Sequence, residues 1–316
     1  MDELPKGGLK NIGTPIVPIS MLEEEALKNY LKASEITKRI MKFGRELVKK
    51  ERGFLKIAET MEAEIKREGG KPAFPVNISI NGNAAHDSPE AIDARIISDG
   101  DLVKVDFGVM IDGYAIDTAF SYNPSNEHAR QIEAAELALQ NALSVVKAGV
   151  NVKDIGTEIE KTIKEYGFKP VENLCGHSLE QYNLHAGIEI PNVARGGYTL
   201  KEGDVFAIEP FTSTGKGYVN EGDYCQIYSL EPHANMAVRM PKSRELLTRV
   251  AAEHLTMPFA ARWFKDIPML RLALSDLEKQ GILHSYPVLK EAQKDCFVSQ
   301  AETTLIVEQE GAKILV

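Results

Sequence analysis

An internal repeat is the sequence feature that most limits what this chain can fold into. The segment MEAEIKREGGKP (61–72) matches IEKTIKEYGFKP (159–170) at an offset of 98 residues, with six identical positions. Further along, ISDGDLVKVD (97–106) matches LKEGDVFAIE (200–209) at an offset of 103, which aligns Asp106 with Glu209. Chance is a weak explanation for two matching blocks in the same order. We therefore expect two halves related by a pseudo-two-fold axis.

Each half is predicted to contain two helices followed by antiparallel strands. Ser20 and Glu23 form an S-x-x-E capping pattern ahead of an amphipathic helix that runs to about Lys50. Pairing the halves into one sheet covered by helices would bury their apolar faces, so we expect an α+β fold. The other predicted helices cover about 55–68, Ser125 to near Gly149, and Asn151 to Gly167.

The stretch 103–120 is predicted to be a β-hairpin that carries two acids. Alternating apolar residues indicate a strand, and Asp112-Gly113 is typical of a type I′ turn. That turn would pair Gly108 with Asp117 and make Asp106 and Asp117 diagonal neighbours on one face, about 7–8 Å apart. Gly108 would leave space between them. Two converging carboxylates repel each other unless a positive charge lies there. Taken alone, such a pair is more typical of a solvated face, and the rest of the chain is what favours a bound cation.

The second half is interrupted by a mostly helical insert, at about 233–296. Beyond the insert, the apolar strand SQAETTLIV contains Glu302, which we pair with Asp117 by symmetry. Because Asp106 is likewise aligned with Glu209, four carboxylates are expected near the axis.

Three histidines lie in segments with Gly-rich turns. His177 and His185 are eight residues apart, so an extended chain would place both on one face, and His86 maps near His185 in the repeat. Four carboxylates carry a charge that two divalent cations would neutralise, and oxygen-rich donors with one imidazole suit Mn, Fe or Co better than structural zinc. Two such ions can activate water and polarise a carbonyl or phosphoryl oxygen, so the residues alone predict a dinuclear metallohydrolase.

Composition argues against several other classes. No apolar run approaches the ~20 residues of a membrane span. The start, MDELPKGGLKNIG, has no apolar core, so no secretory signal is expected. The three cysteines form no CxxC pair, which is typical of reduced thiols in a cytoplasmic protein. The formal net charge of −9 argues against a general nucleic-acid binder.

The combined pattern resembles a known family. The chain repeats its helices and hairpin, and it carries four acids and one histidine at the expected site, namely Asp106, Asp117, His177, Glu209 and Glu302. This combination resembles the pita-bread metallopeptidases. The segments KVDFGVMIDGYAIDTAF, GHSLEQYNLHAG, AIEPFTSTGKGYV and SQAETTLIV resemble those of type II methionine aminopeptidases, and FPVNISINGNAAHDSP strengthens the match. The insert before Glu302 is the feature that separates type II from type I. The resemblance covers about 22–316, and the lack of a long charged N-terminal extension makes the sequence archaeal-like.

The resemblance implies a pita-bread catalytic domain over 1–316, with 233–296 as an inserted subdomain. It implies an aminopeptidase that removes the initiator methionine from nascent proteins whose second residue is small. The implied cofactors are two divalent metal ions (Co, Mn or Fe, with Zn as an alternative), held by the five residues named above. Other implied roles are substrate contact and catalysis for His86 and His185, proton transfer for Glu209, and a methionine side-chain pocket formed in part by Phe74, Pro75 and Asn77.

The resemblance further implies a cytoplasmic monomer. Its partners would be the N-termini of nascent polypeptides, with transient ribosome association, no membrane contact and no direct nucleic-acid substrate. Three residues depart from the usual family pattern. Asp87 follows His86 where an aromatic residue is usual, Glu180 stands where Gly is common, and Thr303 stands where His is common. We expect Asp87 to raise the pKa of His86.

Two alternatives share part of this pattern. An Xaa-Pro peptidase uses the same five ligands, but such enzymes usually carry a long N-terminal domain, and only about twenty residues precede the first expected helix. A non-catalytic pita-bread paralogue that binds RNA or protein typically loses metal ligands, whereas all five are present here.

Overall fold

The computed structural model describes residues 23–232, 234 and 237–316 of the chain, so the predicted capping residue Ser20 lies outside the described part. The α+β class expected from the sequence is confirmed, because helices are combined with strands that pair antiparallel throughout the described sheets. The helices are α1 (Glu24–Leu47), α2 (Phe54–Arg67), α3 (Ala129–Val145), α4 (Val152–Glu165), α5 (Pro241–Glu253), the 3-10 helix η1 (Ala261–Phe264) and α6 (Leu270–Lys279).

The described strands form four sheets. The first joins β1 (Lys71–Pro72), β4 (Val103–Ile111) and β2 (Asn77–Ile80), with β5 (Tyr114–Tyr122) also on β4. The second orders β14 (Val298–Gln300), β10 (Phe211–Ser213) and β6 (Lys169–Pro170). The third orders β12 (Phe259–Ala260), β11 (Val219–Leu230), β13 (Leu283–Glu291) and β3 (Asn83–Ala85). The fourth orders β16 (Gly311–Ile314), β15 (Thr303–Glu308), β9 (Val205–Ile208), β7 (Cys175–Ser178) and β8 (Glu189–Pro191).

The predicted repeat is visible in the helices. α2 and α4 begin and end at positions separated by the same 98 residues that separate the matching sequence blocks. Each helix is followed by a glycine in the left-handed region, Gly69 with φ 86° and Gly167 with φ 85°. A residue with a β-carbon is disfavoured at such angles, which explains why Gly recurs at this point in both halves.

The strand registers preserve the repeat as well. A strand pair in the first half becomes the related pair in the second half when 98 is added to its first residue number and 103 to its second. These are the offsets of the two matching sequence blocks. The related pairs are Pro72–Val109 with Pro170–Thr212, and Ser79–Lys104 with His177–Ala207. The two halves therefore share a backbone plan, and the sequence prediction of a pseudo-two-fold fold is confirmed.

The β4–β5 hairpin has the predicted register. Ile111 pairs with Tyr114, and Gly108 pairs with Asp117. Asp112 and Gly113 both have positive φ, at 49° and 87°, as a type I′ turn requires. One detail of the prediction is wrong, because the space beside Gly108 is filled. A β-carbon at Gly108 would lie 2.6 Å from Cε1 of Phe74, so the glycine admits the Phe74 ring beside the two acids.

The two halves meet along β5 and the start of β15. Ala119 forms an antiparallel bridge with Glu302, and Oγ1 of Thr118 donates to the Glu302 carbonyl at 2.8 Å. The prediction that Glu302 is the symmetry counterpart of Asp117 is wrong, because the strand registers align Asp117 with a different residue. Gly108 pairs with Asp117, whereas Phe211, its counterpart in the repeat, pairs with Gln300. Gln300 therefore occupies the place of Asp117, and Glu302 comes from the next position on the same face of the strand.

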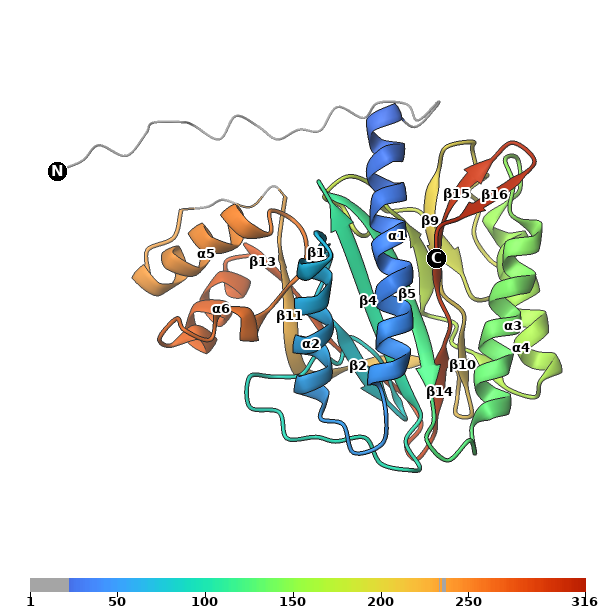
Figure 1. Ribbon diagram of the computed structural model, residues 1–316, viewed down its shortest axis with the longest axis horizontal. Coiled ribbons are helices and arrows are strands. Elements are labelled where there is room, and N and C mark those ends of the chain that lie inside the picture. Colours follow the sequence, from blue (N-terminus) through green and yellow to red (C-terminus); the bar gives the residue numbers. More distant parts are fainter. Residues whose placement is uncertain (1–22, 233, 235–236) are drawn as a thin grey trace.

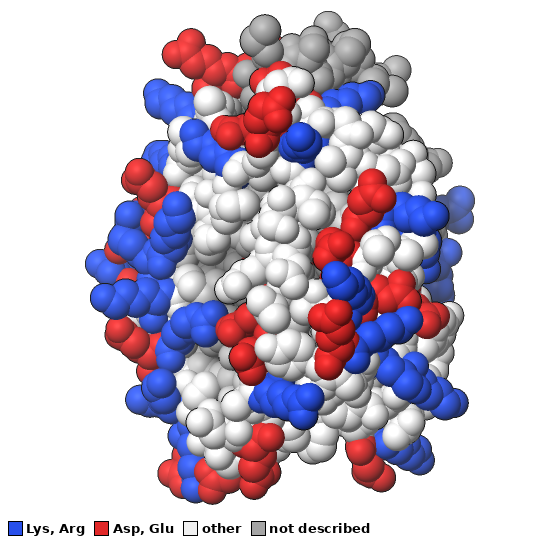
Figure 2. Space-filling model, turned by 90° about the vertical axis from the view of Figure 1, so that its right-hand side faces the viewer, with Lys and Arg blue, Asp and Glu red and all other residues white. Residues whose placement is uncertain are grey.

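Helices α1 to α4 pack against strands of the two halves. α1 packs against β4 and β5, while α3 and α4 pack together over the second half (Figure 1). The core of the first half includes Tyr30, Met61 and Phe107, all fully buried. Burial of an apolar side chain of this size contributes about 1.5–3 kcal/mol, which holds the hairpin rigidly beneath the helices. Figure 2 shows the outer face on the α3–α4 side, where acidic and basic side chains lie intermixed.

Two helix starts illustrate what local sequence can predict. Asn151 caps α4 as expected, and its side chain accepts a hydrogen bond from the Lys153 amide at 2.9 Å. By contrast, α3 begins at Ala129 rather than Ser125. Asn126 adopts a φ of 65° there, and the chain completes a turn before the helix starts. Across the described residues, no helix is long and apolar enough to cross a lipid bilayer.

The segment between β11 and β14 packs around an apolar cluster of its own, which includes Leu246, Phe264 and Leu277. It lies on the side of the molecule opposite α3 and α4 (Figure 1). The expectation that this segment is mostly helical is only partly right. Its last part forms β13, which pairs with β11 and β3 and so becomes part of the sheet beside the site.

Candidate metal centre

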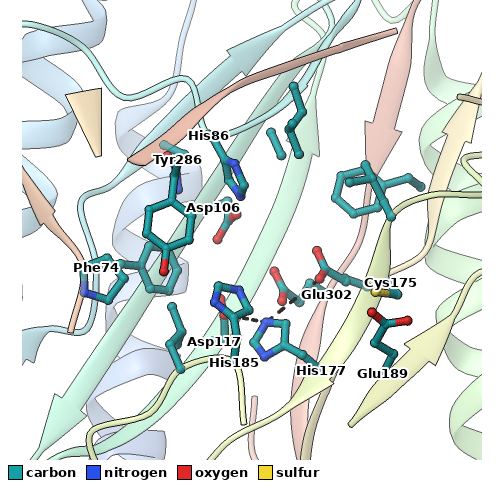
Figure 3. Close-up of a pocket in the computed structure, with 18 of the residues that line it drawn as sticks. Phe74, His86, Asp106, Asp117, Cys175, His177, His185, Glu189, Tyr286 and Glu302 are labelled. Atoms are coloured by element: carbon teal, nitrogen blue, oxygen red, sulfur yellow. Dashed lines mark ion pairs between the residues drawn. The ribbon is translucent and has the colours of Figure 1, made fainter. Parts of the chain in front are cut away.

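A cavity of about 290 Å³ lies at the junction of the two halves and β13. The sequence-predicted site residues line it, except Pro75, which is buried but contributes no part of the cavity wall. Figure 3 shows His86 and Tyr286 on one side of the cavity and Cys175 and Glu189 on the other. The predicted residues that line it are Phe74, Asn77, His86, Asp106, Asp117, His177, His185, Glu209 and Glu302.

The floor of the cavity brings together the five residues that we predicted as metal ligands. Nε2 of His177 lies 3.5 Å from Oδ2 of Asp117 and 4.0 Å from Oε1 of Glu209. Asp117, His177 and Glu302 each offer a ligand atom, and these atoms all lie within 4.8 Å of one another. Asp106 and Glu209 border this group. The strand registers explain the convergence, because the hairpin carries the two Asp residues and the bridge at Ala119 brings Glu302 beside them.

Gln300 is a member of the site that sequence reasoning missed. Its Nε2 donates to Oε2 of Glu209 and to Oε2 of Glu302, both at 3.3 Å. The side chain is 1% exposed. Gln300 stands two residues before Glu302 on the same face of an extended segment, and this spacing is the signal that could have identified it. Its amide bridges two carboxylates that would otherwise repel each other.

Electrostatics shows why this cluster needs a cation. Burial, together with the charges of neighbouring acids, raises the pKa values of Asp106, Glu209 and Glu302 well above their ordinary range. Burial also raises the pKa of Asp117 to about 7. Among the described residues that line the cavity there is no Lys or Arg, so no protein cation offsets these charges. Oδ1 of Asp106 and Oδ1 of Asp117 are buried with no hydrogen-bond partner. The donor set therefore fits divalent cations.

His86 and His185 face the same cavity beside Tyr286. The ring centroid of Tyr286 lies 5.7 Å from that of His86 and 6.0 Å from that of His185. Tyr286 belongs to β13, and sequence reasoning did not identify it. The His185 ring also packs edge-on against His177, with centroids 4.3 Å apart. Both histidines therefore border the acid cluster.

The expected effect of Asp87 on His86 is wrong. Burial, followed by the charge of His185, lowers the pKa of His86 to about 4, so its imidazole is neutral at pH 7. The Asp87 carboxylate turns away from the cavity and accepts two hydrogen bonds from Arg95, each 2.9 Å long. The positive charge of Arg95 offsets the negative charge of Asp87, so the electrostatic effect of Asp87 on the pKa of His86 is small.

The wall opposite His86 contains Cys175 and Glu189. Burial, then the charges of Glu209 and Glu189, raises the pKa of Cys175 to about 12. A thiol held protonated in this way is a poor nucleophile and a poor metal ligand. From the sequence we predicted only that Cys175 is a reduced thiol. All three cysteines are free in the structure.

The two other departures from the family pattern lie away from the cavity. Glu180 is exposed, and its backbone pairs with Asn183. Oγ1 of Thr303 donates to the carbonyl of Val316 at 2.8 Å. Neither side chain lines the cavity, so neither alters its walls directly.

Comparison with known proteins is consistent with this geometry. The profile described as Metallopeptidase family M24 matches residues 28–240. A protein named Methionine aminopeptidase from Thermococcus kodakarensis is 45% identical over 299 residues, which cover 93% of this chain and 99% of that protein.

Two solved structures share the fold. One, titled "Structure of a thermophilic Arx1", has a TM-score of 0.83 at 17% identity, covering 93% of this chain and 91% of that chain. The crystal structure of Methionine aminopeptidase from Thermotoga maritima has a TM-score of 0.68 at 18% identity, covering 93% of this chain and 97% of that chain. At these identities the likeness concerns the fold alone, and it fits the predicted pita-bread architecture.

Proposed function

The chain belongs to metallopeptidase family M24, and we propose that it is a type II methionine aminopeptidase that removes the initiator methionine from nascent proteins whose second residue is small. The relative from Thermococcus kodakarensis, matched along nearly its whole length, supports the assignment by its name. One observation carries the proposal on this chain itself. Four buried carboxylates and His177 converge on one cavity whose described lining has no cationic side chain.

The metal ligands in this proposal are the five residues predicted from the sequence: Asp106, Asp117, His177, Glu209 and Glu302. They would hold two divalent ions, with Co, Mn or Fe favoured by the oxygen-rich donor set and Zn as an alternative. When bound, such ions activate water and polarise the scissile carbonyl group. The unpartnered oxygens of Asp106 and Asp117 support this arrangement, because buried carboxylate oxygens are rarely left without a partner.

The protein's own groups would handle the proton and the substrate. Glu209 is our candidate to accept a proton from the attacking water and pass it to the leaving amine. Its carboxylate lies beside the proposed water site, and Gln300 holds its second oxygen in place. His86 and His185 are neutral side chains that border the acid cluster, so each can present a ring nitrogen to the peptide at the scissile bond.

The methionine side chain would bind against Phe74 and Asn77. The Phe74 ring packs over Gly108 beside the acids, so an apolar substrate side chain resting on it lies next to the reacting carbonyl group. An apolar wall of this kind discriminates one methylene group by only about 1–3 kcal/mol, and slow cleavage of similar residues is expected. Pro75 would act indirectly, by fixing the buried turn between these two residues.

The cellular context in this proposal follows from the substrate. The protein would be a cytoplasmic monomer that meets the N-termini of nascent polypeptides, with transient ribosome association, and neither a membrane nor a nucleic acid would be its substrate. Residues 1–316 would form one catalytic domain, with 233–296 as an inserted subdomain. The separate apolar cluster around Phe264 supports that division.

A tripeptide assay with metal analysis tests the proposed function. We expect the purified protein to release Met from Met-Ala-Ser, to leave Ala-Pro-Ser intact, and to lose activity when a chelator removes its metal. Asp106→Ala should abolish turnover and reduce metal content, whereas Asp266→Ala, which changes an exposed acid of the insert, should do neither. Preferred cleavage of Ala-Pro-Ser would favour the Xaa-Pro peptidase alternative. Normal turnover by Asp106→Ala would refute the metal assignment.

A further inference from the structure

His86 occupies an unusual backbone conformation at the cavity wall. Its φ is 62°, in the left-handed region that residues with a β-carbon rarely adopt. Such a conformation persists only where neighbouring contacts enforce it. The ring itself makes one weak hydrogen bond, in which Nδ1 lies 3.3 Å from the carbonyl of Pro287, and it packs edge-on against Tyr286. The backbone that follows His86 must therefore supply most of the constraint.

Ser88 provides the first of these contacts. It is fully buried, and its Oγ donates to the carbonyl of Val76 at 3.0 Å. Val76 lies between Phe74 and Asn77, the two residues proposed to contact the methionine side chain. One serine hydroxyl thus ties the His86 turn to the part of the substrate pocket formed by Phe74 and Asn77.

Arg262 anchors Ser88 from the insert. Its Nη1 donates to Oγ of Ser88 at 2.7 Å and to the carbonyl of Pro89 at 3.2 Å. The arginine side chain is 2% exposed and forms an ion pair with Glu62 on α2. A guanidinium group with donors in a fixed plane suits this simultaneous contact with a hydroxyl, a carbonyl and a carboxylate.

Glu62 completes the network. Its Oε1 accepts a hydrogen bond from the Val76 amide at 3.1 Å, and its Oε2 accepts one from Nε1 of Trp263 at 2.8 Å. The amide and the carbonyl of Val76 are therefore both fixed, one by Glu62 and the other by Ser88. Both contacts depend on the same buried arginine.

Asp87 constrains the turn from its other side. The Asp87 side chain is 1% exposed. Its carboxylate accepts hydrogen bonds from Arg95 and, at 2.7 Å, from Nδ2 of Asn83. The carbonyl of Asp87 accepts a hydrogen bond from the Ile78 amide at 2.8 Å. Residues 87–89 are thus held by ionic or hydrogen-bonded side chains from three separate segments of the chain.

We propose that Arg262 and Ser88 are positioning residues for the peptidase reaction, which hold His86 and the Phe74–Asn77 wall in the geometry that substrate requires. The inference rests on the proposed function and deepens it, because it gives the insert a part in positioning the groups that contact substrate. None of the four side chains in the Glu62–Arg262–Ser88–Asp87 set lies among the five proposed metal ligands. Their loss should therefore alter substrate chemistry while metal binding persists.

Ser88→Ala is the most selective test. It removes the hydroxyl that joins Arg262 to Val76, while the Glu62–Arg262 pair and the Val76 amide contact remain. Ser243→Ala is the matched control, since Ser243 is also fully buried and hydrogen-bonded, to Asp276 within the insert, and does not line the cavity. Both variants would be compared with wild type for metal content, for kcat and KM on Met-Ala-Ser, and for melting temperature.

A chemical readout at His86 separates positioning from general stability. Diethyl pyrocarbonate modifies accessible neutral imidazoles, and peptide mapping gives the rate at His86 relative to His128. We expect Ser88→Ala to keep its metal, to lower kcat about tenfold, to raise KM because the Phe74–Asn77 wall loses a support, and to alter the His86 modification rate at least threefold. Displacement of a catalytic group by about 1 Å can cost up to about 10²-fold in rate, so a tenfold loss is a moderate expectation.

The outcomes discriminate clearly. Unchanged kcat and unchanged His86 reactivity in Ser88→Ala would overturn the proposal, as would equal losses in Ser243→Ala. Arg262→Met is the second test and should show the same changes in kcat and His86 reactivity as Ser88→Ala. If it fails to fold, the double variant Glu62→Leu with Arg262→Met removes the buried ion pair as a unit and is tested in its place. Wild type that releases no Met would instead contradict the proposed function, and the His86 modification rates would still test the positioning network.

Discussion

Asp117→Asn in the metal-free protein offers a quantitative test of the buried acid cluster. Asp117 is 4% exposed, and burial raises its pKa from 3.8 to about 7 in the folded state. In the unfolded chain the pKa returns to its ordinary value. A raised folded-state pKa means that the stability is complete below about pH 4 and is lost as the pH rises toward 7. A shift of about 3 units corresponds to about 4 kcal/mol, and Asn, which does not ionise, escapes that loss.

The assay is urea unfolding with a chelator present, at pH 5 and at pH 8. Between these values the stability of Asp117→Asn relative to wild type should increase by about 3 kcal/mol, because ionisation of Asp117 penalises only the wild type. Glu202→Gln, which changes an exposed acid, is the control. With a divalent metal added, the order should reverse, because ligand binding stabilises the folded wild type. A relative stability that stays constant between pH 5 and pH 8, or that falls, would refute the reasoning.

Four further outcomes follow from the site. His86→Asn should keep its full metal content, measured by mass spectrometry, while kcat/KM on Met-Ala-Ser falls by about 10²-fold; loss of metal would contradict its assignment as a substrate contact. Gln300→Glu should lower the melting temperature of the metal-free protein at pH 8 more than at pH 5, because it adds a fifth acid beside Glu209 and Glu302. Gly108→Ala should destabilise the protein by about 1–3 kcal/mol in urea unfolding and raise KM, because the added β-carbon would lie 2.6 Å from the Phe74 ring; an unchanged KM would argue against Phe74 as the methionine wall. Arg95→Gln should lower kcat with metal content unchanged, because Asp87 loses its bidentate partner; unaltered steady-state kinetics would show that this pair does not constrain His86.

The fold was largely accessible from the sequence because the repeat fixes both halves at once. Gly69 and Gly167 mark equivalent helix ends, and Asp112-Gly113 fixes the hairpin register without knowledge of any distant contact. These are local signals. The start of α3 was misjudged because Ser125 is an acceptable cap, whereas the left-handed Asn126 that delays the helix depends on a turn whose geometry the sequence does not fix.

The site was predictable where residue type and spacing carry chemistry. Asp106, Asp117, His177, Glu209 and Glu302 do converge around the cavity. The symmetry argument for Glu302 was off by two positions, because the repeat preserves strand register but does not preserve which positions carry acids.

Contacts between distant segments were beyond sequence reasoning. Gln300 gains its role only when β14 lies beside Glu209, and Tyr286 reaches the cavity only because β13 pairs with β11 and β3. The prediction that Asp87 raises the pKa of His86 relied only on their being adjacent in the sequence. Its interaction with Arg95 turns the carboxylate away, and no local pattern reveals that pairing.

The most direct test of the central claim is an anomalous diffraction measurement on crystals of the manganese-loaded protein. Five side chains from two related halves are proposed to hold two metal ions in one cavity. The account predicts two anomalous peaks about 3.5–4 Å apart on the floor of that cavity, surrounded by the five proposed ligands. A single peak in protein that releases Met from Met-Ala-Ser, or peaks that lie away from Asp106, Glu209 and Glu302, would contradict it.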